Sequence, residues 1–524
     1  MAAKLFAALL IGSTETEMRV YELNYRKGMK QIDHVSTRIS LGSDAYSDGR
    51  LDPEILSQLC RILRDMKTIM DGYKVDAYMA CATSSLRELR SDLLTRDYIE
   101  KQTGLRITII SNSEQRFLDY KAIACESTSF EKIITNGTAI ADIGGNSIQI
   151  SLFDKDKLVT TQNIRMGKIS TRDQYESIAS DMFHYEKIVR EILEHELNGF
   201  AKLYQKEKER PIQNMIICDP DLMEFARHQY AQVMEKQVEN SGRVIHINAD
   251  RFRELYKKLL SMKPDDVAQH FSISIHSSHL VTQSMMFINI MMERMGASEL
   301  WLMDVSVCDG LCYDYGISNK LLQQTHNFED DIIAASRVIA KRYKCNQAHI
   351  RQMEEICLEI FNKTRKIHGM KNRERLLLQI SAILHNCGKY ISLANVSECA
   401  YNIIMATEII GLSHNERKII ANVVMFNNRH FHYYNETDDT SDLTKEEYLT
   451  VAKLTAILRI ANALDRSHKQ KCKGMQVVLR DNQMLINVST KEDLSLERKT
   501  LEDRASFFEE VFNIHPVLHQ KKSL

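Results

Sequence analysis

Residues 141–150, with the sequence ADIGGNSIQI, are the part of the chain best suited to bind a phosphate group. They read as a buried strand, a tight turn at Gly144 and Gly145, and a second strand, because glycine tolerates the positive φ expected at such a turn. Backbone amides at a glycine turn point outward and form a nest for an anion, and the Ser147 hydroxyl adds a donor at its rim. The pattern therefore predicts that phosphate is bound by Gly144, Gly145, Asn146 and Ser147, whereas the simpler alternative is an ordinary hairpin.

Asp142 stands at the end of the first of these strands. A carboxylate at that place can hold a divalent cation, or orient a water molecule, against a bound phosphate. The alternative is that Asp142 only caps its own turn. A second, weaker phosphate-type turn lies near the N-terminus, where residues 5–11 and 18–23 read as strands joined at Gly12, Ser13 and Thr14.

Any anion site must be local, because the chain as a whole is almost uncharged. Its 524 residues include 69 Lys and Arg against 70 Asp and Glu, for a net charge of -1. No global field draws such a chain to nucleic acid or to a membrane surface, and we expect neither as a partner. A hydrophobic fraction of 44% with 27% charged residues is typical of a soluble globular protein, here long enough for several domains.

The 11 cysteines form no CxxC pair and show no regular spacing, so we predict reduced thiols in a cytoplasmic protein. Cys308 and Cys312 could share one face of a helix, but the lack of a second pair nearby favours a core position over a metal site. The apolar start of the chain is too short for a signal peptide or a membrane span, and it continues like a strand.

Strands, polar turns and helices alternate along the first three-fifths of the chain, which predicts an α/β architecture. Apolar spacing indicates a helix over 51–73, strands over 75–82 and 107–110, and a helix from there to about residue 125. Further on, we expect strands over 158–167, 215–218 and 300–303, and helices over 175–208, 252–262 and 283–295. The last of these helices is rich in methionine, which favours core packing over a binding face.

From about residue 319 the pattern changes to consecutive amphipathic helices, which predicts an all-helical domain. The expected helices span 328–343, 349–367, 373–385, 397–410 and 448–464. Residues 476–488 then alternate like a short hairpin, and residues 506–512 read as an apolar helical turn. We therefore expect a small α+β piece at the C-terminal end.

Six short strings occur in an order that resembles the exopolyphosphatase and guanosine pentaphosphate phosphohydrolase (Ppx/GppA) family. They are Thr83-Ser84-Ser85-Leu86-Arg87; Ile109-Ile110-Ser111 followed by Glu114; Asp142-Ile143-Gly144-Gly145; Arg165-Met166-Gly167; Ile457-Leu458-Arg459-Ile460-Ala461; and Ala463-Leu464-Asp465-Arg466-Ser467-His468. The resemblance covers nearly the whole chain. It implies two actin-like (ribonuclease H-like) domains over 1–127 and 128–317, an HD-like helical domain over 318–473, and a small α+β segment over 474–524.

The resemblance also implies an activity, the hydrolysis of a phosphoanhydride in the cleft between the two actin-like domains. The substrate would be polyphosphate or guanosine pentaphosphate, the cofactor Mg²⁺ or Mn²⁺, and the protein a homodimer through its helical domain. Such hydrolysis needs donors for the phosphate oxygens, a positive clamp and a carboxylate that orients water. Asp142 and the hairpin turn match the family, and Arg87 matches its phosphate-facing arginine; the alternative for Arg87 is an exposed charge at a helix start.

Several residues depart from the family where the chemistry would take place. The glutamate credited with activating water falls on Gln115, and a second glutamate, at the end of the hairpin, falls on Gln149. An amide accepts no proton at neutral pH, so general-base catalysis at Gln115 is lost. Glu114 could replace it after a shift of one residue at the turn, and Glu15 could replace it from the first loop.

The third phosphate segment and the helical domain change in the same way. Residues 216–221 carry two aspartates where the family has a glycine-rich segment. HD phosphohydrolases bind metal through two His and two Asp; His368 and His385 stand at matching places, but Asn386 and Asn462 replace the aspartates. A neutral amide is a weaker ligand for a hard cation, so we expect no metal there and internal hydrogen bonds for both histidines.

Two functions of different classes fit these residues. One is a phosphoanhydride hydrolase of reduced activity that uses Asp142 with Glu114 or Glu15. The other is a catalytically degenerate protein that binds polyphosphate or a guanosine nucleotide and signals to a partner. Its motivation is the set of amides at carboxylate positions: Gln115, Gln149, Asn386 and Asn462. An actin-like ATPase or sugar kinase is disfavoured, because neither is expected to carry the helical domain with its LDRSH string.

Overall fold

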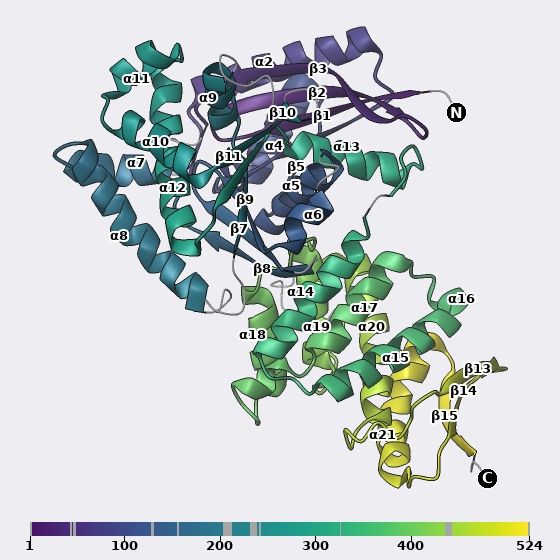
Figure 1. The fold of residues 1–524 in the computed structure, drawn as a ribbon. Coiled ribbons are helices and arrows are strands. Elements are labelled where there is room, and N and C mark those ends of the chain that lie inside the picture. Colours follow the sequence, from purple (N-terminus) through teal and green to yellow (C-terminus); the bar gives the residue numbers. More distant parts are fainter. Residues whose placement is uncertain are drawn as a thin grey trace. The chain divides into compact units, whose positions relative to one another are not determined.

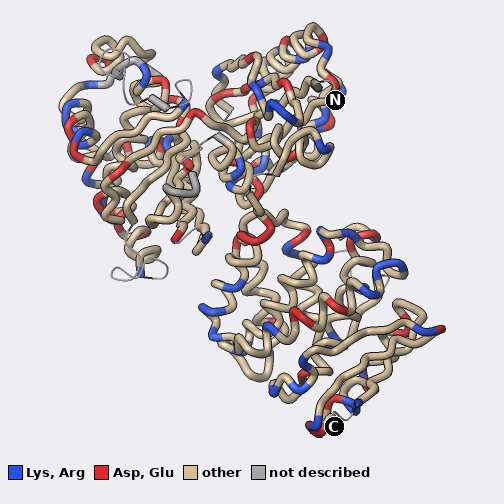
Figure 2. The backbone as a smooth tube through the Cα atoms, turned by 45° about the vertical axis from the view of Figure 1, so that its right-hand side comes forward, with Lys and Arg blue, Asp and Glu red and all other residues tan. Residues whose placement is uncertain are grey.

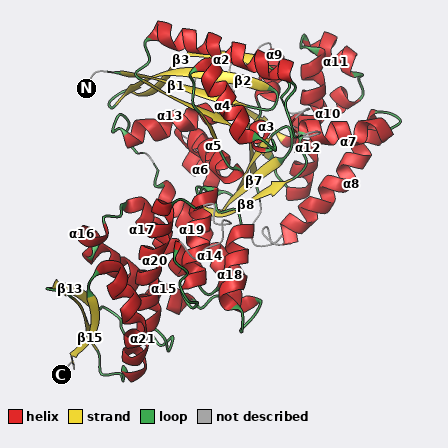
Figure 3. Cartoon of the chain, turned by 180° about the vertical axis from the view of Figure 1, so that it is seen from behind, coloured by secondary structure: helices red, strands yellow, loops and turns green. Residues whose placement is uncertain are grey.

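Two β-sheets lie in the first of the two units into which the chain divides, Met1–Phe328 and Glu329–Leu524. The second unit is largely helical (Figures 1 and 3). The computed structural model describes residues 3–41, 45, 49–126, 130–154, 157–202, 212–230, 238–239, 243–324, 326–434 and 443–521. Positively and negatively charged residues are interspersed along the backbone of both units (Figure 2), in keeping with the small net charge.

The first sheet has five strands in the order β3-β2-β1-β4-β5. Their bounds are β1 Lys4–Ile11, β2 Glu15–Asn24, β3 Gly28–Arg38, β4 Ala77–Ala82 and β5 Ile107–Ile109. Strand β1 pairs antiparallel with β2 and parallel with β4, and its residues 6–9 are completely buried. A strand that is covered on both faces reads as a continuous apolar run. The apolar N-terminal stretch is therefore a strand, as predicted, and the structure places it at the centre of the sheet.

The second sheet has seven strands in the order β10-β11-β12-β9-β6-β7-β8. Their bounds are β6 Thr138–Ile143, β7 Ile148–Asp154, β8 Lys157–Ile164, β9 Asn214–Cys218, β10 Val238–Glu239, β11 Val244–Asn248 and β12 Glu299–Met303. Strand β6 pairs antiparallel with β7 and parallel with β9. This repeats the pairing of β1 with β2 and β4. The turns β1–β2 and β6–β7 therefore occupy equivalent places in the two sheets.

Helices cover both sheets. In the first sheet's half they are α2 Pro53–Tyr73, α3 Ser84–Arg87, α4 Asp92–Thr103, α5 Asn112–Glu126 and α6 Phe130–Thr135. In the second half they are α7 Lys168–Tyr175, the 3-10 turn η1 Glu176–Ile178, α8 Met182–Phe200, α9 Pro220–Tyr230, α10 Ala249–Leu260, α11 Pro264–Phe271, α12 Ile275–Met295 and α13 Val307–Ser318. The predicted helix over 175–208 is wrong at its start, because η1 separates α7 from α8; its residues 203–208 lie outside the described residues.

Helix α12 is the centre of the second core. It packs against α7, α8, α9, α10 and α11. Its five methionines from Met285 to Met295 are all buried in one hydrophobic cluster with the strands of the second sheet. Unbranched, flexible methionine fills the irregular space between so many neighbours. The prediction of a core helix is confirmed; Cys308 and Cys312 on α13 are likewise buried and form no disulfide.

The second unit consists of packed helices followed by a small sheet. The helices are α14 Phe328–Arg342, α15 Gln347–Lys363, α16 Arg365–His368, α17 Asn372–Leu384, η4 Cys387–Tyr390, α18 Val396–Ala406, α19 His414–Phe426 and α20 Lys445–Leu464. Strands β13 Gln476–Arg480, β14 Gln483–Ser489 and β15 His515–Lys521 form the sheet, and α21 Ser495–Phe512 joins the last two. The predicted hairpin is confirmed, whereas the predicted turn of helix is the end of a full helix.

Candidate phosphate site between the two sheets

The two equivalent hairpin turns meet. A Cβ on Gly145, in the β6–β7 turn, would lie 2.6 Å from the Ser13 hydroxyl oxygen in the β1–β2 turn. Neither Gly144 nor Gly145 has a positive φ, so the predicted reason for the two glycines is wrong. At Gly145, glycine is needed for the close approach of another part of the chain. The structure thus brings together Gly12, Ser13 and Thr14 with Gly144, Gly145, Asn146 and Ser147.

Helix α7 is seated directly on the β6–β7 turn. A Cβ on Gly167, the residue before α7, would overlap the backbone of Gly145 and Asn146. The amides of Lys168 and Ile169 donate to the carbonyls of Gly144 and Gly145, each at 2.9 Å. The carbonyls of the turn are therefore used by α7, which fixes the orientation of its peptide planes.

The amides of the same turn remain available. Gly144 donates its amide to the Ser147 carbonyl at 3.0 Å, which closes the turn. The amides of Gly145, Asn146 and Ser147 donate to no group of the described chain, and the hydroxyls of Ser13 and Ser147 form no hydrogen bond with it either. Consecutive unused donors on a rigid turn are the feature that an anion nest requires. Phosphate binding by these residues stays a prediction.

Asp142 lies beside this turn and is bonded to Gln115. The Gln115 side-chain amide donates to Asp142 Oδ2 at 2.9 Å, so α5 of the first half reaches β6 of the second. The pKa of Asp142 is raised to about 6, mainly by burial and also by the charge of Asp219, whereas Lys168 and Gln115 oppose the rise. A buried carboxyl with a pKa near neutrality is the usual mark of a functional acid or base.

Lys168, a residue that the sequence reasoning did not single out, forms two buried or nearly buried ion pairs at the site. Its ammonium lies 3.2 and 3.1 Å from the two oxygens of Asp219 and 3.2 Å from Asp221 Oδ2. Its side chain is 5% exposed and that of Asp219 is fully buried. Burial alone would lower the pKa of Lys168, but the two carboxylates outweigh burial and raise it. Two features of the sequence could have identified Lys168. It directly follows Gly167, and this chain carries two aspartates, Asp219 and Asp221, where the resemblance expects a glycine-rich segment.

The other predicted catalytic carboxylates have different surroundings. Glu114 accepts hydrogen bonds from the amide (2.9 Å) and hydroxyl (2.7 Å) of Ser111, so it caps the start of its own helix. Glu15 accepts a hydrogen bond from Ser36 at 2.8 Å. Burial raises the pKa of Glu15, Glu17 raises it further, and Asp221 and Lys168 also act on it. Glu15 therefore lies within the electrostatic reach of the Lys168 cluster.

Two arginines complete the surroundings. Arg87 donates to the Ile110 carbonyl at 2.7 Å and to Asn112 Oδ1 at 2.5 Å, so it fastens the loop that leads into α5. Arg116, which the sequence reasoning missed, is 3% exposed on α5 and lowers the pKa of both Asp142 and Asp119. Ser85 donates to the Gly12 carbonyl at 3.1 Å and ties α3 to the first turn.

The carboxylate oxygens at this site are the groups that could bind the predicted Mg²⁺ or Mn²⁺. One oxygen of Asp142 already accepts from Gln115, and Asp219 and Asp221 are bonded to Lys168. Across the described part of the chain, no group of three or more His, Cys, Asp or Glu is arranged to hold a metal ion. A hard divalent cation needs several free oxygen ligands at once. The residues present therefore do not fit a tightly held cation.

The predicted HD-like site separates into two places in the second unit. His368 accepts from the Met370 amide at 2.9 Å and contacts the Phe361 carbonyl at 2.9 Å. His385 lies 2.7 Å from the Ala382 carbonyl and 3.0 Å from His349, which the sequence reasoning did not name. Both histidines are buried and hydrogen-bonded internally, as expected.

His349 connects two further residues, Asp465 and His468, to this second place. It lies 2.7 Å from Asp465 and stacks on His468 with ring centroids 3.6 Å apart. Burial and the neighbouring His349 lower the pKa of His385 to about 3. Asn386 and Asn462 lie close by, in the wall of a cavity that also includes His468.

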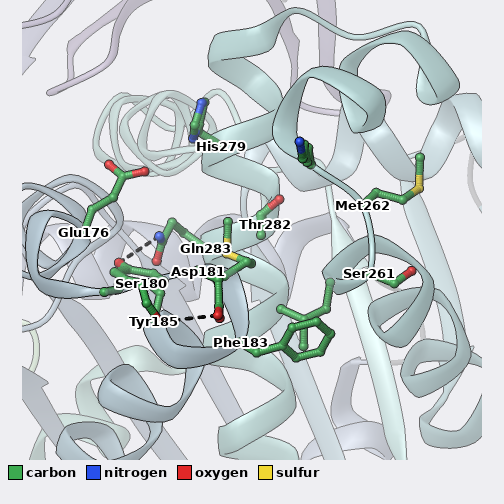
Figure 4. A pocket seen from close by; sticks show the side chains of 14 residues that line it. Glu176, Ser180, Asp181, Phe183, Tyr185, Ser261, Met262, His279, Thr282 and Gln283 are labelled. Carbon is green, nitrogen blue, oxygen red and sulfur yellow. Dashed lines mark hydrogen bonds between the residues drawn. The ribbon is translucent and has the colours of Figure 1, made fainter.

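A separate cavity of about 500 Å³ lies in the second half of the first unit, among α8, the end of α10 and α12 (Figure 4). Tyr185, Gln283, Thr282 and Phe183 are among its lining residues, and Gln283 donates to the Tyr185 hydroxyl at 2.8 Å. None of the predicted site residues lines it.

Two α/β halves with the same strand pairing, joined at facing hairpin turns, define a duplicated fold of the actin-like class. The chain matches the model of the Ppx/GppA phosphatase family over residues 20–319 and that of Ppx/GppA phosphatase, domain III, over residues 334–505. The first match alone covers more than half of the chain. The protein therefore belongs to the Ppx/GppA phosphatase family.

Solved structures agree on the fold. An exopolyphosphatase from Cytophaga hutchinsonii is 14% identical with a TM-score of 0.54, and the match covers 61% of this chain and all (100%) of that one. A Ppx/GppA family member from Aquifex aeolicus is 14% identical with a TM-score of 0.50, covering 62% of this chain and 100% of that one. At such identities the likeness shows the fold alone, and it confirms the predicted α/β fold class over the part of the chain that it covers. No curated protein sequence matches the chain.

Within the described residues, no helix is both long and apolar enough to cross a membrane.

Proposed function

We propose that the first unit is a slow phosphoanhydride hydrolase that removes the terminal phosphate from polyphosphate or guanosine pentaphosphate. The observation that supports this most is the position of Asp142, whose pKa is raised to about 6, beside the unused amides of the β6–β7 turn. Such a carboxyl is poised to act as a general base near neutral pH. The proposal rests on the same residues that the family resemblance selects.

In this proposal the terminal phosphate accepts hydrogen bonds from the amides of Gly145, Asn146 and Ser147 and from the Ser13 hydroxyl. Preorganised donors of this kind stabilise the charge on the phosphoryl oxygens in the transition state. Water attacks the terminal phosphorus, the bond from phosphorus to the bridging oxygen breaks, and the water proton moves to Asp142 Oδ1. Gln115 holds the other carboxylate oxygen at 2.9 Å and so fixes the plane of the base. The products are one orthophosphate and a chain shorter by one phosphate.

No step of this reaction passes through a metal ion, because the donor set does not fit one. Because the family resemblance predicts Mg²⁺ or Mn²⁺, the assay is carried out with these ions and, in parallel, with a chelator. The homodimer and the choice between polyphosphate and the guanosine nucleotide also stay predictions.

The second candidate, binding without turnover, is favoured by one contact. By the resemblance, Gln115 stands at the position of the water-activating glutamate, and its side-chain amide donates to Asp142. The site therefore contains one carboxylate where a pair of carboxylates would be expected. Loss of a general base slows proton transfer by a factor of roughly 10² to 10⁴. A protein slowed this far could retain the ligand and report its presence through the relative positions of its two α/β halves.

One experiment separates the two candidates. Phosphate release from long-chain polyphosphate and from guanosine pentaphosphate is measured with Mg²⁺ or Mn²⁺ for the native chain, Asp142→Ala, Gln115→Glu and, as a matched control, the exposed Asp250→Ala. The hydrolase proposal expects release that Asp142→Ala abolishes and Asp250→Ala preserves. Stoichiometric binding without release, together with a gain of release in Gln115→Glu, supports the binding protein instead. A native chain that neither binds nor releases phosphate refutes both.

A further inference from the structure

Arg38 lies beside the first of the two hairpin turns. It is the last residue of strand β3, and its backbone pairs with Glu15, the residue that directly follows the β1–β2 turn. The amide of the next residue, Ile39, donates to the Thr14 carbonyl in that turn at 3.0 Å. The end of β3 is therefore fastened to one of the two turns that form the candidate phosphate site.

The Arg38 side chain reaches the second half of the first unit. Its guanidinium nitrogens lie 3.3 Å from Asp221 Oδ1, 3.4 Å from Glu224 Oε2 and 3.4 Å from the Ser274 hydroxyl oxygen. Asp221 also accepts from Lys168 at 3.2 Å, and the backbone amide of Lys168 donates to a carbonyl of the β6–β7 turn. A series of direct contacts thus runs from one turn to the other through the Arg38 guanidinium.

The contacts of Arg38 are weak enough to be exchanged for others. All three are at the long end of the range for a hydrogen bond, and the Arg38 side chain is 43% exposed. An exposed ion pair of this kind contributes about 1 kcal/mol or less to stability. The ammonium of Lys168 is in the opposite situation, because it is enclosed with the fully buried Asp219.

Release of Arg38 would leave no buried carboxylate without a partner. Asp221 would keep its ion pair with Lys168, and the Glu224 side chain is 56% exposed, so water can solvate its charge. Arg87, the arginine that the resemblance selects, is less easily released, because it holds the loop before α5 through two hydrogen bonds. Arg38 is therefore better placed than Arg87 to move onto an incoming anion.

We infer that Arg38 is the positive clamp of the candidate phosphate site. It leaves Asp221 and Glu224 when ligand enters, and it binds a phosphate of the chain next to the terminal one. This inference rests on the phosphate site proposed at the hairpin turns. A guanidinium suits the role, because it pairs with phosphate oxygens through two parallel hydrogen bonds. The turn amides hold the terminal phosphate, whereas the exposed Arg38 holds the part of the ligand that extends toward solvent.

Modification of arginine by phenylglyoxal tests this contact at single residues. The whole chain is treated with and without tripolyphosphate, and peptide mapping by mass spectrometry follows Arg38 and a control, Arg251, which is exposed on α10 and pairs with Glu254. At about ten times the concentration that gives half of the effect, tripolyphosphate should slow the modification of Arg38 by about tenfold, because only the free protein reacts. Arg251 should react at the same rate in both samples.

The kinetics of Arg38→Gln separate a clamp from a structural residue. For phosphate release from tripolyphosphate, KM should rise by about tenfold or more while kcat changes little, because a phosphate that does not react contributes equally to the binding of substrate and transition state. Arg38→Lys keeps the charge but not the paired hydrogen bonds, so its KM should lie between those of the native chain and Arg38→Gln. Arg251→Gln should match the native chain. A residue needed only for the fold would not raise KM selectively.

The clamp and the proposed hydrolysis can fail separately. If the native chain releases phosphate but Arg38 reacts equally with and without tripolyphosphate, the clamp is refuted and the hydrolysis stands. If Arg38 is protected in a chain that releases no phosphate, the clamp stands and the hydrolysis is refuted. Absence of both protection and release refutes both. A lower kcat with unchanged KM in Arg38→Gln overturns the assignment of Arg38 to a phosphate that does not react.

Discussion

Replacing Lys168 by methionine tests the ion pairs that fix the candidate phosphate site. Methionine keeps most of the volume of the side chain but removes the ammonium that lies 3.1 to 3.2 Å from Asp219 and Asp221. Asp219 is fully buried, so its charge would lose its main partner in a place that water does not reach. Among the described residues, only the Ser284 hydroxyl and the Leu222 amide would remain as donors to it.

The expected cost follows from the burial of the pair. Breaking a buried ion pair by removing one partner costs about 3 to 5 kcal/mol, and we take about 3 because Asp221 is partly exposed. The first unit spans residues 1–328. At about 2.1 cal/mol/K per residue its unfolding entropy is about 0.7 kcal/mol/K, so the melting temperature should fall by about 4 °C.

Differential scanning calorimetry measures this shift, with two controls. Lys499→Met breaks the exposed pair with Asp503 and should shift the melting temperature by well under 1 °C. The double variant Lys168→Met/Asp219→Asn removes both charges and should recover most of the loss. If Lys168→Met melts like the native chain, or if the double variant is no more stable than the single one, the ion pair does not stabilise the site and the reasoning fails.

Three further perturbations give measurable outcomes. Gly167→Ala forces a Cβ into the backbone of Gly145 and Asn146, so it should lower the free energy of unfolding by at least about 2 kcal/mol. The control Gly199→Ala lies in an open position of helix α8 and should raise the free energy of unfolding by about 0.5 to 1 kcal/mol. Equal effects of the two substitutions would contradict the packing of α7 on the turn. Glu114→Gln keeps an acceptor for Ser111 and should leave phosphate release unchanged, and a tenfold or greater loss would identify Glu114 as the base. For His385, the folded pKa of about 3 lies below the ordinary value of 6.5, so the unfolded chain takes up a proton first as the pH falls. The free energy of unfolding should therefore fall between pH 6.5 and pH 3, by about 1.4 kcal/mol per pH unit, and from pH 7 to pH 5 the native chain should lose about 2 kcal/mol more than His385→Gln. Denaturant unfolding at the two pH values checks this, and parallel pH profiles of the two proteins would refute it.

The sequence predicted the elements that depend on local pattern. The β6–β7 hairpin, the central strand at the N-terminus, the methionine-rich core helix and the α+β piece near the C-terminal end all carry their signal within one or two dozen residues. Gln115 and Asp142 were both named, and the structure joins them. Their contact depends on the packing of α5 against the second sheet and could not be seen in either segment.

The residues that were missed owe their surroundings to distant parts of the chain. Lys168 meets its partners 51 and 53 residues later, and His349 meets His385 and Asp465 at separations of 36 and 116 residues. The glycines of the hairpin turn show the same limitation. Both glycines were identified from the sequence. Glycine is needed at Gly145, however, because Ser13 approaches from the other sheet, and a local sequence pattern cannot reveal that contact.

The two places where this chain departs from its family differ in how their charges are compensated. After β9, Asp219 and Asp221 stand where the resemblance expects a glycine-rich segment, and the buried Lys168 forms an ion pair with each of them. The Lys168 ammonium is therefore engaged within the protein, and the proposed phosphate would bind at the turn amides instead. In the helical unit, Asn386 and Asn462 share a cavity wall with Lys389, Arg466 and Arg504, and no ion pair joins these three cations to an acidic side chain among the described residues. The charges at the hairpin site are therefore paired within the protein, whereas three of the cations in the cavity of the helical unit form no ion pair among the described residues.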